Sequence, residues 1–130
     1  MLFRSQGSLS AGSNYTIAYT GANFAITPAS LSVSANAGQS KVYGSADPTL
    51  TYSFSGLVNG DTSSVFSGSQ TRASGENVGS YAISQGSLSA GSNYTIVYTG
   101  ANFAITPASL SVSANTGQGK VYGSAEPTLT

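Results

Sequence analysis

The chain contains no cysteine, no histidine and no tryptophan among its 130 residues, and only 6% of its residues are charged. Without cysteine there is no disulfide and no thiolate metal site, and without histidine the usual base of Ser-His and Cys-His catalytic pairs is missing. A catalytic base would have to be a carboxylate or a lysine with a strongly shifted pKa. The composition therefore predicts that the protein is not an enzyme, with no catalytic residues, no metal site and no cofactor.

The few charges also limit the partners. Four basic residues balance four acidic ones, so the net charge is zero. They are Arg4, Lys41, Arg72 and Lys120, and Asp47, Asp61, Glu76 and Glu126. Binding to phosphate backbones or to anionic lipid requires clustered positive charge, so nucleic acid is not expected as a partner. No apolar run approaches the roughly 18 residues that span a bilayer, so no membrane insertion is expected in this segment.

What the chain does contain is a repeat. Residues 5–51 match residues 84–130 at an offset of 79, with only four differences. The differences are Ala18/Val97, Ala37/Thr116, Ser40/Gly119 and Asp47/Glu126. Such near-identity indicates a tandem array, which has to be recognised before any other fold argument. The first four residues do not match residues 80–83, so we expect a piece of something longer.

Prolines divide the array. Pro28 and Pro107 each lie between a segment ending in Ile-Thr and one containing Ser-Leu-Ser-Val. We therefore predict a complete 79-residue repeat at 29–107, the C-terminal part of a truncated repeat at 1–28, and the N-terminal part of another at 108–130. Because proline fixes its own φ and favours extended geometry before it, successive repeats should form a semi-rigid rod.

Several stretches alternate apolar and polar residues with the two-residue period of a strand that buries one face. The predicted inward residues are Leu31, Val33 and Ala35; Leu50, Tyr52 and Phe54; and Tyr81 and Ile83. This periodicity argues against a flexible linker, despite the 16 glycines and the serine-rich composition.

Residues 93–106, NYTIVYTGANFAIT, predict a β-hairpin with its turn at residues 99–102. The residues expected to point inward are Tyr94, Ile96 and Tyr98 on the first strand, and Phe103 and Ile105 on the second. The Ala18/Val97 difference falls on the opposite face, where a change of size is more easily tolerated. The equivalent hairpin of the first copy is expected at residues 14–27.

Residues 57–68, LVNGDTSSVFSG, break the strand pattern. Asn59-Gly60 predicts a turn, and Asp61 or Thr62 is placed to cap a short helical turn. With about six strands per repeat, this order predicts a mostly β fold, a small β-grasp-like module with one short helical turn. An immunoglobulin-like β-sandwich, which needs about seven strands and no helix, is the alternative.

Four stretches carry a resemblance to a known family. They are the Tyr43-Gly44 pair followed by Pro48, residues 56–61, the Val-Gly-Ser-Tyr motif at 78–81, and residues 93–108. Together they resemble the YGX-type MBG repeat, also called the YDG-like repeat, of large bacterial surface adhesins and filamentous haemagglutinin-like proteins. The resemblance implies a stalk or binding module in tandem, with no catalytic residue. It also implies an extracellular or cell-surface location, with the export signal outside this segment.

Candidate ligand-binding carboxylates are few. Asp47, Asp61 and Glu76 offer oxygen ligands, but the dense Asp/Asn/Gly spacing of a calcium loop is missing. Lys41 and Glu76, with an asparagine nearby, would form an isopeptide crosslink only if all three groups were buried together. We therefore predict no metal site and leave a crosslink at Lys41 open.

Aromatic and asparagine side chains are the other candidates. Tyr43 and Tyr122 could offer aromatic surface to a sugar, although interior packing is the expected role of such tyrosines. Asn14 and Asn93 each begin an Asn-x-Thr triplet, the acceptor pattern for N-glycosylation. Binding residues are otherwise left unassigned.

These observations favour a structural stalk repeat of a bacterial surface or secreted adhesin, with neighbouring repeats as its partners. The alternative is a module that binds host glycan or matrix protein multivalently. A third possibility is self-association through strand edges, because residues 5–28 and 108–130 should each expose unpaired edges. Those ends are expected to fray or to associate head to tail, with fraying favoured because both pieces lack a counterpart of residues 52–80.

Overall fold

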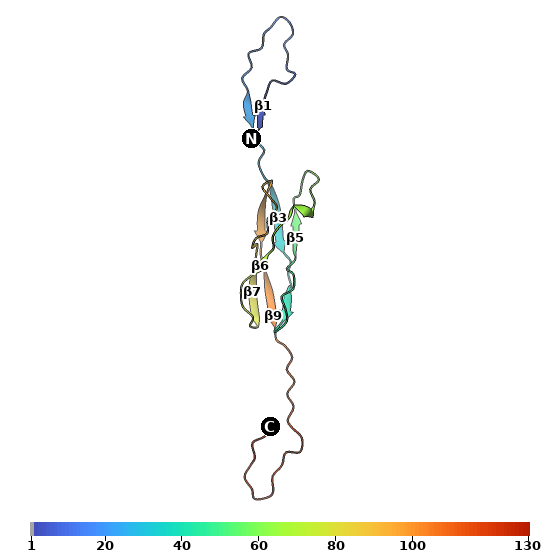
Figure 1. Ribbon diagram of the computed structural model, residues 1–130, viewed down its shortest axis with the longest axis vertical. Coiled ribbons are helices and arrows are strands. Elements are labelled where there is room, and N and C mark those ends of the chain that lie inside the picture. Colours follow the sequence, from blue (N-terminus) through green and yellow to red (C-terminus); the bar gives the residue numbers. More distant parts are fainter. Residues whose placement is uncertain (1) are drawn as a thin grey trace.

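The computed structural model describes residues 2–130, and it shows packed strands in the middle of the chain with an extended segment leaving at each end (Figure 1). The elements in chain order are β1 (Leu2–Arg4), β2 (Ala22–Phe24), β3 (Ala29–Ala35), β4 (Ser40–Val42), β5 (Tyr52–Ser55), the 3-10 turn η1 (Ser63–Val65), β6 (Thr71–Arg72), β7 (Gly79–Ser84), β8 (Tyr94–Thr99) and β9 (Ala101–Thr106). We use "the module" for residues 29–106, which carry β3 to β9. No helix within residues 2–130 could cross a membrane.

The module contains two small sheets. One has three strands in the order β5-β3-β8, with β3 antiparallel to β5 and parallel to β8. The other has four strands in the order β4-β9-β7-β6, with β9 parallel to β4 and antiparallel to β7. The prediction of a mostly β module with one short helical turn is thus confirmed, and its strands are divided between two sheets.

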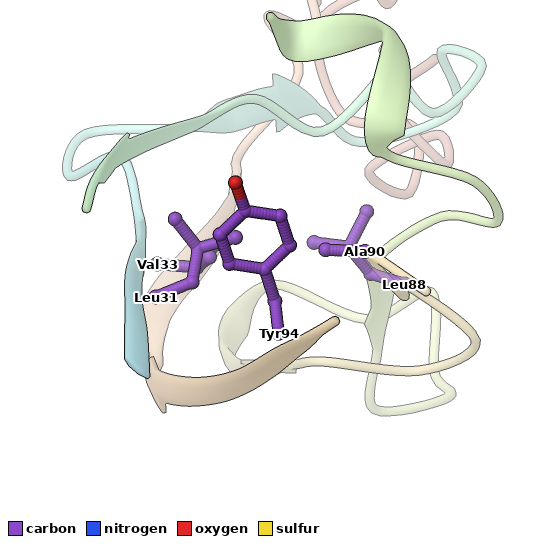
Figure 2. Close-up of a cluster of buried hydrophobic side chains, with 5 residues drawn as sticks. All are labelled: Leu31, Val33, Leu88, Ala90 and Tyr94. Atoms are coloured by element: carbon purple, nitrogen blue, oxygen red, sulfur yellow. The ribbon is translucent and has the colours of Figure 1, made fainter. Parts of the chain in front are cut away.

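The core is built from the apolar residues of the predicted apolar–polar alternation. Leu31, Val33 and Ala35 of β3 are buried, while the serines between them are exposed. The Tyr94 cluster contains Leu31, Val33, Leu88, Ala90 and Tyr94, and the Phe103 cluster contains Ala35, Ile83, Phe103 and Ile105. Figure 2 shows the Tyr94 ring between Leu31 and Val33 on one side and Leu88 and Ala90 on the other. The two clusters follow each other along β3, because Leu31 and Ala35 belong to different ones.

Not every expected inward residue is buried. Phe54 of β5 is 40% exposed and Tyr52 is half-buried, since β5 is the edge of its sheet. Their rings contact that of Phe66, with centroids 4.9 Å from Phe54 and 5.3 Å from Tyr52. Val97 is 57% exposed, which confirms the predicted facing of β8.

The predicted hairpin at residues 93–106 is wrong. Its strands form as β8 and β9, but they pair in different sheets, and the chain changes sheet at Gly100. Alternation identified both strands and their inward faces, yet it carries no information about which strand each one pairs with. β8 takes β3 as its partner, and β9 takes β4 and β7.

Gly100 leaves no room for a side chain at this crossing. A Cβ there would lie 2.6 Å from the backbone oxygen of Ile83. We expect Gly100→Ala to destabilise the module by about 1–3 kcal/mol, because the backbone has to move to relieve the overlap. Chemical denaturation measures this effect. Gly119→Ala, whose Cβ would meet nothing within 4 Å, is the control and should leave unfolding unchanged.

One of the two predicted capping residues, Thr62, caps the helical turn. The Thr62 hydroxyl oxygen accepts a hydrogen bond from the Ser64 N–H at 3.4 Å at the start of η1. Asn59 and Gly60 both have positive φ, and the Asp61 N–H donates to the Val58 carbonyl at 3.1 Å, which confirms the turn. Asp61 itself does not cap η1, since its carboxylate accepts from the Tyr94 hydroxyl at 2.6 Å.

Candidate functional site

Four charged side chains from distant parts of the module meet at one place. They are Lys41 of β4, Asp47 of the following loop, Arg72 of β6, and Glu76 of the loop before β7. Lys41 Nζ lies 2.6 Å from Asp47 Oδ1 and also contacts Glu76 Oε2. Arg72 holds Asp47 with two nitrogens, at 2.6 and 2.9 Å, and Glu76 with one, at 2.8 Å. We call this set the charge cluster.

The cations of the charge cluster are buried and its carboxylates are open. The side chains of Lys41 and Arg72 are 4% and 8% exposed, whereas those of Asp47 and Glu76 are 46% and 66% exposed. The Arg72 guanidinium also lies 5.3 Å from the centroids of the Tyr81 and Phe103 rings. Buried cations are tolerated when they are paired and hydrogen-bonded, as both are here.

Each charge shifts the pKa values of the others. Hydrogen bonds from Arg72 and then Lys41 hold the pKa of the Asp47 carboxyl well below its usual range. The pKa of Glu76 is lowered chiefly by its hydrogen bond from Lys41. Bonds to Asp47 and then Glu76 raise the pKa of Lys41, and a bond to Asp47 raises that of Arg72. All four groups are therefore held in their charged forms.

The charge cluster joins two segments: β4 with the loop that follows it, and the antiparallel β6–β7 hairpin. β4 and β6 are the two edge strands of the four-stranded sheet, so the cluster connects its opposite edges, and Arg72 lies over the rings of Tyr81 and Phe103 from the two strands between them. Arg72 also donates to the carbonyls of Ala73 and Gly75, which fixes the course of the loop between β6 and β7. The charge cluster therefore holds these segments together through noncovalent ion pairs and hydrogen bonds.

The expected isopeptide partners come together only in part. Lys41 and Glu76 are in contact, but the third group is Asp47, an ionised carboxylate held by Arg72. A raised pKa keeps Lys41 protonated, and an ammonium has no lone pair with which to attack a carboxyl carbon. A metal site built from the candidate carboxylates would need Asp47, Asp61 and Glu76 to lie together. Asp47 and Glu76 do lie together, but each is bound by Lys41 and Arg72. Asp61 lies elsewhere, where it accepts a hydrogen bond from the Tyr94 hydroxyl.

We therefore expect the intact mass of the folded chain to equal the sequence mass, without the loss of water that a bond from Lys41 to a carboxyl group causes, or the loss of ammonia that a bond to an asparagine causes. Lys41→Met serves as the reference, because it cannot form the bond. Mass spectrometry of both proteins under denaturing conditions makes the comparison. A loss of water or ammonia in the parent chain that Lys41→Met removes would contradict the noncovalent assignment.

The cluster also predicts a pH profile. The lowered pKa values of Asp47 and Glu76 stabilise the fold at pH values above about 4, which is the pKa of such carboxyls in the unfolded chain. This stabilisation is lost as the pH falls through the pKa values of the two carboxyls in the folded chain. Lys41 and Tyr94 have raised pKa values, so their contribution is complete below about pH 10 and is lost as pH rises further. The melting temperature should be level from about pH 5 to 9 and fall on both sides. Circular dichroism melts test this, and Glu126→Gln, in an exposed pair, should not change the profile.

A lateral groove of about 640 Å³ lies beside the charge cluster, lined by residues 47–50 and 68–76 together with Tyr52. Among its lining residues, Gln70 is buried and donates through Nε2 to the Tyr98 hydroxyl at 2.6 Å. Its Oε1 atom is buried and has no hydrogen-bond partner within residues 2–130. The groove thus combines open carboxylates, a tyrosine and an amide.

The sequence did not single out Arg72 or Gln70. For Arg72 a signal was present: it is the only arginine between residues 5 and 130, in a chain with few charges, and such a residue is seldom buried without a partner. Gln70 carried no comparable signal, because glutamines are ordinary surface residues.

The remaining sequence candidates lie on the surface. Tyr43 is 52% exposed rather than packed in the interior, and Tyr122 is fully exposed. Tyr43 lines a crevice of about 510 Å³, with Val78 and Pro107 among its neighbours, where the chain leaves the module. Asn14 and Asn93 are both exposed.

A family model described as MBG domain (YGX type) matches residues 31–104, more than half of the chain. The chain belongs to this family. The matched residues run from β3 into β9, and they include all four members of the charge cluster. Membership of the MBG family indicates a repeat domain of surface proteins. No curated protein and no solved structure matches the chain.

Proposed function

We propose that this chain is part of a stalk in a bacterial surface or secreted adhesin, where each MBG domain acts as a noncatalytic spacer. The observation that supports this most directly is the position of the two chain connections: the chain enters the module at β3 and leaves after β9 at opposite ends (Figure 1). Tandem modules connected in this way extend end to end instead of folding back on one another.

The connection between repeats is also short. Residue 106 ends β9, and a copy of β3 begins at Ala108, so Pro107 alone separates the two strands. A proline here restricts the backbone on both sides of the junction. Crevices of about 510 and 530 Å³ at the two ends of the module are lined partly by the connecting residues Pro107 and Pro28. Neighbouring repeats are therefore the expected partners at these ends.

The spacer is tested by completing the second repeat, with a copy of residues 52–107 added after Thr130. Small-angle scattering should show two modules arranged end to end, with a narrow distribution of bend angles. Pro107→Gly in the same protein should broaden that distribution, because glycine removes the restriction. A broad distribution in the unsubstituted protein, or side-by-side packing of the two modules, would contradict a rod-like stalk.

A second function, binding of host glycan or matrix protein, is favoured by the lateral groove. None of its lining residues belongs to the connection between repeats, so every module of an array keeps it open. Saccharide hydroxyls are suitable donors to the open Asp47 and Glu76 carboxylates, and an array of such sites would bind multivalently. Glycan-array binding that is lost in Ser74→Tyr, which fills the groove from its exposed rim, would support this function over a pure spacer.

A further inference from the structure

The lateral groove runs along the edges of two sheets. Its lining comes from two stretches, residues 47–50 with Tyr52 of β5, and residues 68–76, which include β6. β5 is an edge strand of the three-stranded sheet, and β6 is an edge strand of the four-stranded sheet. An edge strand presents backbone N–H and carbonyl groups that no neighbouring strand uses, so it is a site where a further strand can pair.

The β6 edge has backbone groups directed away from β7. The Ala73 N–H donates to the Ala82 carbonyl at 2.9 Å, which makes these two residues a hydrogen-bonded pair of the antiparallel β6–β7 ladder. Hydrogen-bonded and non-hydrogen-bonded pairs alternate along such a ladder, so the backbone groups of Gln70 and Arg72 point to the other side. Within residues 2–130, no backbone group outside this ladder bonds to the backbone of either residue.

A buried acceptor without a donor belongs to the same strand edge. Gln70 is 7% exposed, its Nε2 atom donates to the Tyr98 hydroxyl, and its Oε1 atom has no partner within residues 2–130. A buried polar atom without a hydrogen bond is costly and rare, so it marks a place where a donor is missing. The N–H groups of an added strand are donors of the required kind.

The carboxylates of the charge cluster select the side chain of the ligand. Asp47 and Glu76 both line the groove, and both are exposed while the cations that bind them are buried. Five hydrogen bonds from Lys41 and Arg72 reach the two carboxylates, which together accept about eight. A cationic side chain is therefore the complementary partner on the open side, and an anionic one is repelled.

We propose that the lateral groove binds an extended segment of another polypeptide, which adds a strand to β6 and places a lysine or arginine side chain on Asp47 and Glu76. The added strand bonds to the outward backbone groups of Gln70 and Arg72. The side chains of Gln70 and Arg72 are both buried, on one face of the sheet. Alternate residues of the added strand face that same side, where a basic residue lies beside the carboxylates.

The geometry favours a polypeptide over a saccharide as the occupant. The outward backbone groups of Gln70 and Arg72 are two residues apart, which is the spacing at which an added strand presents its own N–H and carbonyl groups. A saccharide offers hydroxyls but no such repeated pairs. On β5, by contrast, only Tyr52 lines the groove, so β6 is the strand that is extended. This inference rests on the groove-binding function proposed above and is independent of the spacer function.

Titration of the full chain with synthetic peptides, followed through the backbone amide signals in NMR spectra, tests the proposal. The probe is a capped heptapeptide of alternating threonine and valine with lysine in place of the central valine. The same peptide with glutamate at the centre is its matched control. The lysine peptide should shift the signals of residues 70–72, Asp47 and Glu76, and the glutamate peptide should not. Equal binding of the two peptides, or shifts confined to other residues, would overturn the proposal.

Two further peptides separate strand addition from binding through side chains alone. Both keep the central lysine, and one carries N-methyl groups on its odd-numbered residues and the other on its even-numbered residues. Only one of these two sets of N–H groups faces β6 in an added strand. One methylated peptide should therefore lose binding and the other should keep it, whereas equal effects of the two would rule out strand addition.

Substitutions in the chain complete the test. Glu76→Gln removes one exposed charge and should weaken the lysine peptide by about threefold, the scale of an exposed ion pair. Glu126→Gln, in an exposed pair outside the groove, should bind like the parent chain. If no peptide binds while a glycan does and is lost in Ser74→Tyr, the polypeptide inference is wrong and groove binding stands. If neither binds, both are wrong.

Discussion

Leu31→Ala should destabilise the module by about 2–5 kcal/mol, the range measured for removing a buried leucine side chain. Leu31 is fully buried in the Tyr94 cluster, on the strand that is central to its sheet. Shortening the side chain loses apolar burial and leaves a cavity beside the Tyr94 ring, which is held in place by hydrogen bonds to Asp61 and Val58. Denaturant unfolding followed by circular dichroism measures the change.

Leu110→Ala is the matched control, since it lies in the same eight-residue sequence, ASLSVSAN, in the second copy. Leu110 is 86% exposed, so its truncation should change the unfolding of the module by less than about 0.5 kcal/mol. Equal effects of the two substitutions would mean that the second copy is packed as tightly as the first.

The second large effect is expected at the charge cluster. Lys41→Met keeps the apolar stem but removes the ammonium that contacts Asp47 and Glu76, so the two carboxylates lose a shared cation. We expect a fall in melting temperature at neutral pH, because the two carboxylates lose their charge-assisted hydrogen bonds from the Lys41 ammonium and keep only those from Arg72. The alkaline decline of stability due to Lys41 should also weaken.

Lys120→Met provides the comparison in the same local sequence, KVYGSA. Lys120 is 38% exposed and pairs at 2.5 Å with Glu126, so its removal should have little effect, as is usual for exposed ion pairs. Melting curves of both variants at low and high salt separate the two positions. If Lys41→Met has the same melting temperature as the parent chain, the ion pairs of Lys41 do not stabilise the module.

The repeat shows which features a sequence can predict. Identical residues make identical local hydrogen bonds in both copies, as Gln39 and Gln118 do, because both partners lie within the same short stretch. The Asn59-Gly60 turn and the Thr62 cap were predictable for the same reason. The inward faces of β3 and β9 followed from alternation alone, since the period of a strand is a local property.

Features that depend on distant partners were not predictable in this way. A hairpin was expected where the chain instead changes sheet at Gly100, because alternation does not specify the neighbouring strand. The meeting of Lys41 with Arg72 depends on the sheet order β4-β9-β7-β6, which no local pattern encodes. Likewise, Leu31 and Leu110 differ in burial although their sequence neighbours are the same.

The parallel pairing of β3 with β8 has a mechanical consequence for a chain pulled at its two ends. Tension enters through β3 and leaves through β9, which continues from β8 with only Gly100 between them. The hydrogen bonds of six consecutive residue pairs between β3 and β8 lie across the direction of pull, so they share the load instead of opening one after another. A module built in this way should resist extension up to a high force and then yield in one step, which single-molecule pulling can measure.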